Sequence, residues 1–295
     1  MVRHTPDRPV DVSAALPEAA AMRAETVRLH PRPGSPTCRE SSVGGPPLWP
    51  ADEPWPVCAA RHHDGTGAYR GPTPYLPVAQ VFRADVPELP APAGCDVLQV
   101  LWCPYEHDPD GEVGPLPMVR WRDSRAVDTV ATAPAPAPGV PEDHVPRPCV
   151  LDPERVTEYP GMDELVESLP PDEQVPMWDR LDRFEAATGW NYQLHLGTAP
   201  GIKLGGYPGW TQPPAWPDCP SCDRRMYHLI TLASRECDAE SWRTWLPVQD
   251  RTVADDSREA LAAGAGLLLG DLGGVYVFEC LSCPDRPYAH RFDCC

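Results

Sequence analysis

The chain has 295 residues, enough for two domains or for one large duplicated domain with a sizeable core. Its formal net charge is −18, so the phosphates of nucleic acids and of anionic membranes should be repelled, while a basic protein is a plausible partner. The chain has no apolar run long enough to cross a bilayer, and its N-terminus has no apolar secretory segment. We therefore expect a cytoplasmic protein.

The first 40 residues are interpreted as an N-terminal extension. A first unit is expected over residues 41–150, where apolar runs predict the strands of a sheet. The predicted strands are Val78–Phe82, Val97–Cys103, Met118–Trp121 and Cys149–Leu151.

Residues 151–200 are expected to form a helical connector, with helices at Asp163–Leu169 and Gln174–Ala187. In the second helix, Met177, Leu181 and Phe184 follow the spacing of one buried helical face. A second unit is expected over residues 201–295. Its predicted elements are the strands Tyr227–Leu232 and Val275–Phe278 and the short helix Ser257–Ala263.

Two stretches of fifteen residues resemble each other. Residues 44–58 read GGPPLWPADEPWPVC and residues 205–219 read GGYPGWTQPPAWPDC, with identities at seven positions that include two tryptophans and the final cysteine. Such an internal repeat predicts that one structural unit occurs twice. We therefore predict an α+β fold, internally duplicated, with mainly antiparallel sheet units and a helical insert between the repeats.

The second unit contains two C-x-x-C pairs, Cys219/Cys222 and Cys280/Cys283. Four cysteines in two such pairs are typical of a closed, tetrahedral structural zinc site. Both pairs border tight turns, and the second follows an apolar strand, so an antiparallel sheet would bring them together. The alternatives are a redox C-x-x-C motif and plain buried thiols. Twelve cysteines in a reducing compartment favour metal over disulfides.

The first unit contains a related pattern, with histidine in place of the second cysteine of each pair. Cys58 is followed by His62, and Cys103 by His107. Two cysteines and two histidines are also a standard zinc set, so we predict a second zinc site from these four residues. His63 is an alternative to His62. The competing interpretation is ordinary loop histidines beside buried cysteines.

The remaining cysteines have no ligand spacing, and Cys95, Cys149 and Cys237 are interpreted as packing residues. The terminal pair Cys294–Cys295 either closes a last strand or supplies a labile metal ligand.

Three other polar residues are candidates for an active site. Gln80 and Gln99 interrupt apolar strands, so they either bond to neighbouring backbone or line a polar cleft. Asp271 is interpreted as a turn residue.

A family resemblance rests on four features: the GGxPxW pattern, the strand Pro77–Val81 with the DVPELP segment after it, Leu204–Pro208, and Gly270–Gly273 with the strand that follows. Together these resemble the YwqG-like family, a domain family of unknown function, over about residues 41–295. The resemblance implies an α+β fold with internal duplication and no established activity. Relatives that lie near bacterial toxin genes suggest an immunity role. The Cys/His pairs are not general to that family.

Three functions follow from these observations. The first is a protein-interaction or immunity-like module with structural zinc. The second is an enzyme with a cleft between the two repeats, with Gln80, Gln99 and Asp271 as candidate residues. The third is a metal-handling or redox protein that uses Cys294 and Cys295. The first is favoured by the closed ligand sets and the acidic surface.

Overall fold

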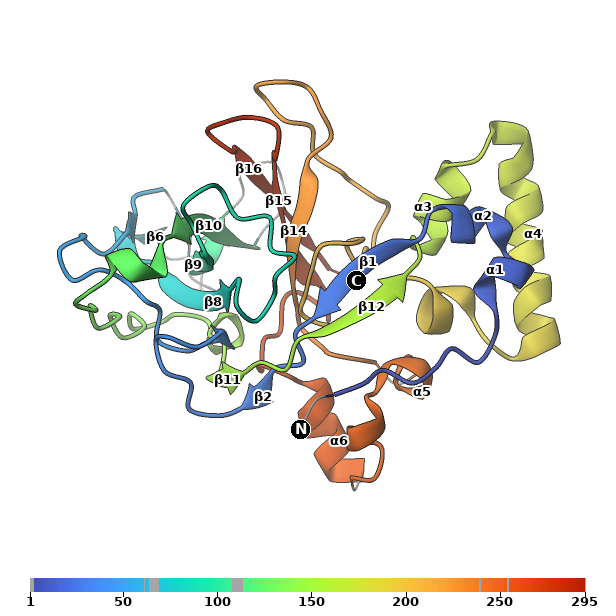
Figure 1. Ribbon diagram of the computed structural model, residues 1–295, viewed down its shortest axis with the longest axis horizontal. Coiled ribbons are helices and arrows are strands. Elements are labelled where there is room, and N and C mark those ends of the chain that lie inside the picture. The colour runs from blue at the N-terminus through green and yellow to red at the C-terminus, as the bar shows by residue number, and fades with distance from the viewer. Residues whose placement is uncertain are drawn as a thin grey trace.

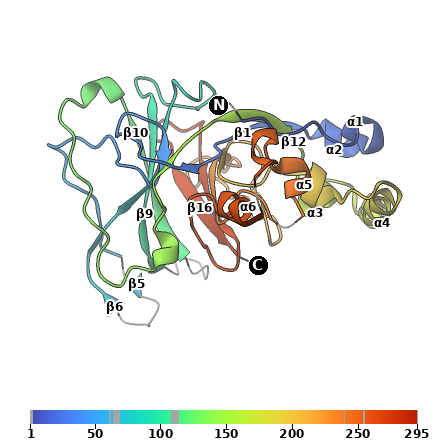
Figure 2. The same ribbon diagram turned by 90° about the horizontal axis from the view of Figure 1, so that it is seen from below.

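The computed structural model describes residues 3–60, 62–63, 69–107, 114–238, 240–253 and 255–294, with the backbone alone at 62–63, 69–70 and 255–256. Within these ranges the fold is α+β, and the strands pair antiparallel in two large sheets and one small one. The two large sheets lie next to each other, and helices α1 to α4 form a lobe at one end of the molecule (Figure 1 and Figure 2).

The six-stranded sheet joins three separate parts of the chain. Its order is β12-β1-β13-β14-β15-β16, so strands from the N-terminal extension and the connector extend the sheet of the second unit. The strands are β1 Ala24–Arg28, β12 Glu154–Glu158, β13 Lys203–Leu204, β14 Tyr227–Ala233, β15 Gly274–Glu279 and β16 Tyr288–Asp293.

The other large sheet belongs mainly to the first unit. Its order is β2-β11-β3-β8-β9-β5-β6, and β10 also pairs with β9; β4 and β7 form a separate pair. The strands are β2 Arg32–Pro33, β3 Ser42–Val43, β4 Val57–Cys58, β5 His62–His63, β6 Tyr69–Arg70, β7 Thr73–Pro74, β8 Leu76–Phe82, β9 Val97–His107, β10 Gly114–Arg122 and β11 Cys149–Val150.

The helices are short except for α4. The α-helices are α1 Val12–Ala15, α2 Pro17–Ala21, α3 Met162–Glu167, α4 Pro171–Thr188, α5 Trp242–Trp245 and α6 Asp255–Ala262. Three 3-10 helices, η1 Ser124–Ala126, η2 Glu142–His144 and η4 Val248–Asp250, and the π-helical turn η3 Tyr192–Leu196 complete the set described. None of the described helices is long and apolar enough to cross a membrane.

Helix α4 begins three residues earlier than expected. Proline is tolerated in the first turn of a helix, where N–H groups have no partner within the helix, so Pro171 starts the helix and Pro176 lies inside it. Met177 and Leu181 are buried as predicted and pack with Leu16 and Leu165 in the core of the helical lobe. The helix ends at Gly189, whose left-handed backbone (φ 73°) suits glycine.

The main hydrophobic core lies between the two large sheets. One face of each sheet contributes aliphatic side chains, for example Val81 and Val100 from the first and Ile230 and Val277 from the second. On the opposite faces, the tryptophans of the repeated loops pack against the sheets: Trp49 against Leu101, and Trp210 against Phe278. This alternation of faces is the ordinary consequence of the two-residue period of a strand.

The pair β8–β9 of one sheet and the pair β14–β15 of the other have the same pattern of residue pairing. Gln80 lies opposite Gln99 in β8 and β9, and Thr231 lies opposite Tyr276 in β14 and β15. Each pair also contains a β-bulge at the corresponding place. The residues that bulge are Val78 in β8 and Leu229 in β14.

The loop that begins each sequence repeat makes the same backbone contact with its sheet. The backbone N–H of Gly44 donates to Val78 (2.8 Å), and that of Gly205 donates to Leu229 (3.2 Å). Both glycines have a left-handed φ, 65° and 67°. The first glycine of each repeat therefore attaches its loop to the bulged residue of its sheet.

A buried ion pair connects β12 to β13. Lys203 and Glu158 have fully buried side chains, and Lys203 Nζ lies 2.6 Å from a Glu158 oxygen. The carboxylate also accepts hydrogen bonds from the backbone N–H groups of Ala199 and Tyr207. Burial raises the pKa of Glu158 and lowers that of Lys203, and each opposite charge counteracts the shift of its partner.

Candidate metal centre

The four cysteines of the second unit form one cluster. Their Sγ atoms all lie within 4.8 Å of one another. Cys219 and Cys283 are 3.8 Å apart, and Cys222 and Cys280 are 3.7 Å apart. A tetrahedron with Zn–S bonds of about 2.3 Å has edges of about 3.8 Å, whereas a disulfide requires about 2.05 Å. The cluster therefore has the dimensions of a tetrahedral thiolate metal site.

Tight turns present these thiols. In the first pair, Ser221 N–H points at Cys219 Sγ (3.4 Å), and Asp223 N–H closes the turn on the Cys219 carbonyl (2.9 Å). In the second pair, Cys280 follows β15 and its N–H bonds to the Pro287 carbonyl (2.8 Å), which fixes the return of the chain to β16. Such turns direct both thiols of a pair to one point.

The surroundings favour the thiolate of Cys280. Its burial opposes ionisation, but hydrogen bonds from the backbone N–H groups of Ser282 and Cys283 and from neighbouring thiols outweigh this and lower its pKa to about 7. Aromatic side chains close one side of the cluster, because Trp210, Trp216 and Phe278 pack against it. A metal there would be shielded by protein, as is usual for a structural site.

The first unit brings together three of its four predicted ligands. Cys58, Cys103 and His107 are buried, and their ligand atoms lie within 4.8 Å of one another. Cys103 and His107 are four residues apart in β9, on either side of an irregularity in its pairing with β10, and the fold brings their ligand atoms together. The distance from Cys58 Sγ to His107 Nε2 is 3.9 Å, close to the edge of about 3.6 Å expected in a zinc tetrahedron.

The side chain of the fourth predicted ligand, His62, lies outside the described residues, as does that of its alternative, His63. The backbone of β5 pairs with β9 at His63 and Glu106. Because the strands are antiparallel, the residue before His63 lies opposite the residue after Glu106, so the backbone of His62 is next to that of His107. The ligand role of all eight predicted residues stays a prediction.

Contacts within the three-residue cluster shift the pKa values of its two thiols. A hydrogen bond with Cys103, helped by His107 and by the Ala60 backbone, lowers the pKa of Cys58 to about 3 against the opposing effect of burial. The pKa of Cys103 rises in turn. Tyr75, which sequence reasoning missed, packs against this cluster, and burial and the neighbouring Cys58 raise its pKa. No spacing rule connects Tyr75 to the cysteines, since the contact arises from the pairing of neighbouring strands.

The glutamines of the first sheet hold neighbouring backbone in place. Gln80 and Gln99 are almost fully buried. Gln80 Nε2 donates to the carbonyls of Cys38 and Glu40, and Gln99 Nε2 donates to Leu48, as the backbone-bonding interpretation predicts. Neither lines any of the four cavities described.

The other candidates lie apart from both clusters. Asp271 is an exposed turn residue, as predicted. Cys149 and Cys237 are buried, in agreement with packing roles, and Cys95 is half-buried. Cys294 lies beside Gln212 after the last strand, and Cys295 lies outside the described residues.

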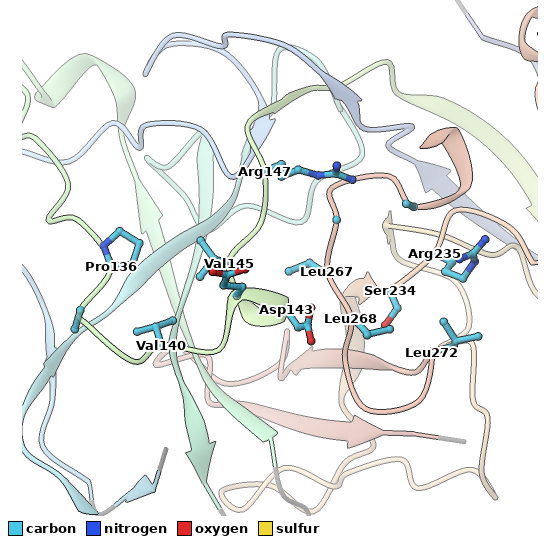
Figure 3. Close-up of a pocket in the computed structure, with 14 residues that line it drawn as sticks. Pro136, Val140, Asp143, Val145, Arg147, Ser234, Arg235, Leu267, Leu268 and Leu272 are labelled. Carbon is cyan, nitrogen blue, oxygen red and sulfur yellow. The ribbon is translucent and has the colours of Figure 1, made fainter. Parts of the chain in front are cut away.

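A hollow of about 700 Å³ lies between the two units (Figure 3). Its walls are the segment around Asp143 and Arg147 and the loop with Leu267, Leu268 and Leu272. The Ser234 hydroxyl in its lining donates to Gly273 and accepts from the Leu269 N–H. Among the described residues, the hydrogen bonds of that hydroxyl are all to backbone groups, so no described side chain acts as its general base.

Comparison with known proteins adds no assignment: no protein-family model and no curated protein matches this chain. The two cysteine clusters and the shared register of the sheets are therefore the observations on which a function has to be built.

Proposed function

We propose that this protein is a zinc-stabilised, protein-binding module of the immunity-like type, related to the YwqG-like family. The single observation that carries the zinc is the four-cysteine cluster, whose sulfur–sulfur distances of 3.7 and 3.8 Å suit tetrahedral zinc. Four protein ligands leave no open position for a substrate, so the metal there is structural. When bound, it supplies no reaction chemistry and only ties the two turns together.

We further propose that the two units arose by duplication and that each has its own zinc. The shared register, the matching bulges and the repeated loop contacts support this proposal. In each unit the zinc would connect the end of the two-tryptophan loop, at Cys58 or Cys219, to the end of a central strand, at Cys103 or Cys280. The second ion would use Cys58, Cys103 and His107, with His62 as the fourth ligand.

The proposed partner is a basic protein in the cytoplasm. A net charge of −18 favours long-range attraction to a basic surface and disfavours nucleic acid. An immunity-like role would place an acidic face of this protein against the basic active site of a toxin.

Binding to such a partner should be fast and sensitive to salt. Surface charges are screened beyond about 8 Å at physiological ionic strength, so the association rate should fall when salt is raised. The measurement is a pull-down from the native host, followed by binding kinetics at two ionic strengths. Tight binding of DNA or RNA at moderate salt would contradict the electrostatic argument, and turnover of a small metabolite with no protein partner recovered would favour an enzyme.

A further inference from the structure

The six-stranded sheet has a cavity on its outer face. The cavity has a volume of about 500 Å³, within the range of small-molecule sites. Its floor consists of residues of β13, β14 and β15 on the face away from the main core. They are Lys203, Thr231, Ala233, Gly274 and Tyr276. The loop with Trp210, the turn η3 and the start of α3 form its walls.

At the corresponding place the first unit is filled. The shared register relates the cross-strand pair Phe82–Val97 of the first sheet to the pair Ala233–Gly274 of the second. The side chains of Phe82 and Val97 pack with Leu48 in one buried cluster.

The second unit has small residues at the positions that correspond to Leu48, Phe82 and Val97. The offset of the sequence repeat relates Leu48 to Gly209, and Gly209, Ala233 and Gly274 all line the cavity. A Cβ added at Gly209 would meet no atom within 4 Å. Three large-to-small differences in one place leave a void that costs stability, as expected where a ligand takes up the space.

The walls are held in place by contacts of their own. The Tyr276 hydroxyl donates to the Gly209 carbonyl (2.5 Å), and the Trp210 ring lies 4.8 Å from the Tyr276 ring, edge to face. The loop therefore does not collapse into the space that Leu48 occupies in the first unit.

The charges that line the cavity indicate the kind of ligand. Both cations of the lining are already neutralised: Lys203 by Glu158 at 2.6 Å and Arg235 by Glu259 at 2.8 Å. Asp163 and Asp238 also line the cavity, and among the described residues neither forms an ion pair, although Asp238 Oδ1 accepts hydrogen bonds from the backbone N–H groups of Glu240 and Ser241. Carboxylates without a cationic partner, in a cavity that aromatic rings also line, suit a cation.

We propose that this cavity binds a small organic cation, a primary amine or a guanidinium with a short apolar body. The site is distinct from both metal clusters and from the proposed protein partner, although Trp210 and Tyr276 also pack against the four-cysteine cluster. The carboxylates would face the charged group, and Trp210 and Tyr276 would contact the apolar body. The space that Gly209, Ala233 and Gly274 leave free would hold the ligand.

Calorimetric titration of the full, zinc-loaded chain with benzylamine tests this proposal, with benzoate as the anion of similar shape. We expect saturable binding of benzylamine and at least tenfold weaker binding of benzoate. Gly209→Leu should abolish benzylamine binding, because it restores the side chain that fills the first unit. Gly71→Leu is the matched control, since a Cβ at Gly71 also meets no atom within 4 Å, and it should bind as the wild type does.

A charge variant keeps the proposal testable if Gly209→Leu fails to fold. Asp163→Asn should weaken benzylamine binding about fivefold and leave benzoate binding unchanged or stronger. The proposal is overturned if the wild type shows no saturable benzylamine binding, if benzoate binds as well as benzylamine, or if both variants bind benzylamine like the wild type.

Discussion

Replacement of Cys280 by serine unfolds or aggregates the second unit, residues 201–295. The thiol lies in the four-cysteine cluster, 3.7 Å from the Cys222 sulfur. Zinc bound in small structural sites contributes about 10–16 kcal/mol of apparent binding free energy, and a whole domain is stable by only about 5–15 kcal/mol. Loss of one thiolate ligand therefore removes much of what holds the unit folded. Thermal unfolding followed by circular dichroism, with the fraction of soluble protein, measures the effect.

Two comparisons separate metal binding from simple packing. Cys237 is as buried as Cys280 but belongs to neither cluster, so Cys237→Ser should cost only about 1–2 kcal/mol. His107→Ala should do less harm than Cys280→Ser, because water can replace an imidazole ligand. A Cys280→Ser protein that melts like the wild type would show that the four-cysteine assignment is wrong.

Replacement of Lys203 by methionine lowers the free energy of unfolding by about 3–5 kcal/mol at pH 7. The reason is that the Glu158 carboxylate stays buried and loses its counter-ion, while the backbone N–H groups of Ala199 and Tyr207 satisfy only part of its charge. Urea denaturation of the two proteins measures the difference. A loss below about 1 kcal/mol would contradict a buried, charged pair.

Two further measurements test whether the unpaired Glu158 carboxylate causes this loss of stability: its pH dependence and a double variant. Without Lys203 the pKa of Glu158 in the folded state is raised further above its unfolded value, so protonation favours folding. The penalty is then largest at high pH and shrinks as the pH falls through the folded-state pKa. Lys203→Met with Glu158→Gln should be more stable than Lys203→Met alone, because no charge is then buried without a partner.

The apolar strands were predictable from the sequence, whereas the strands with charged side chains were not. Val275–Phe278 is a continuous apolar run and Val97–Cys103 is an apolar run interrupted only by Gln99, and both strands have a partner strand on each side. Strands β1 and β12 instead read AETVR and ERVTE. Glu25 and Arg155 are exposed, whereas Arg28 and Glu158 are buried because partners arrive from distant segments, as Arg28 shows by donating to the Trp245 carbonyl. Local pattern cannot reveal such partners.

The candidate metal ligands could be identified because ligand spacing is a local property. Cysteine pairs on tight turns leave a recognisable pattern, and the repeat relates Cys58 to Cys219. The cavity over the second sheet could not be predicted in this way. It appears only when Gly209 is aligned in space with Leu48, which requires the strand register as well as the repeat.

Elemental analysis of the protein, purified without chelator, is the most direct test of the zinc sites. We predict between one and two zinc ions per chain: one in the four-cysteine cluster and a second, partly or fully occupied, at Cys58, Cys103 and His107. Cys103→Ser should then lower the zinc content toward one per chain and leave the four-cysteine site filled. Protein that is folded, monodisperse and free of zinc would contradict the central claim.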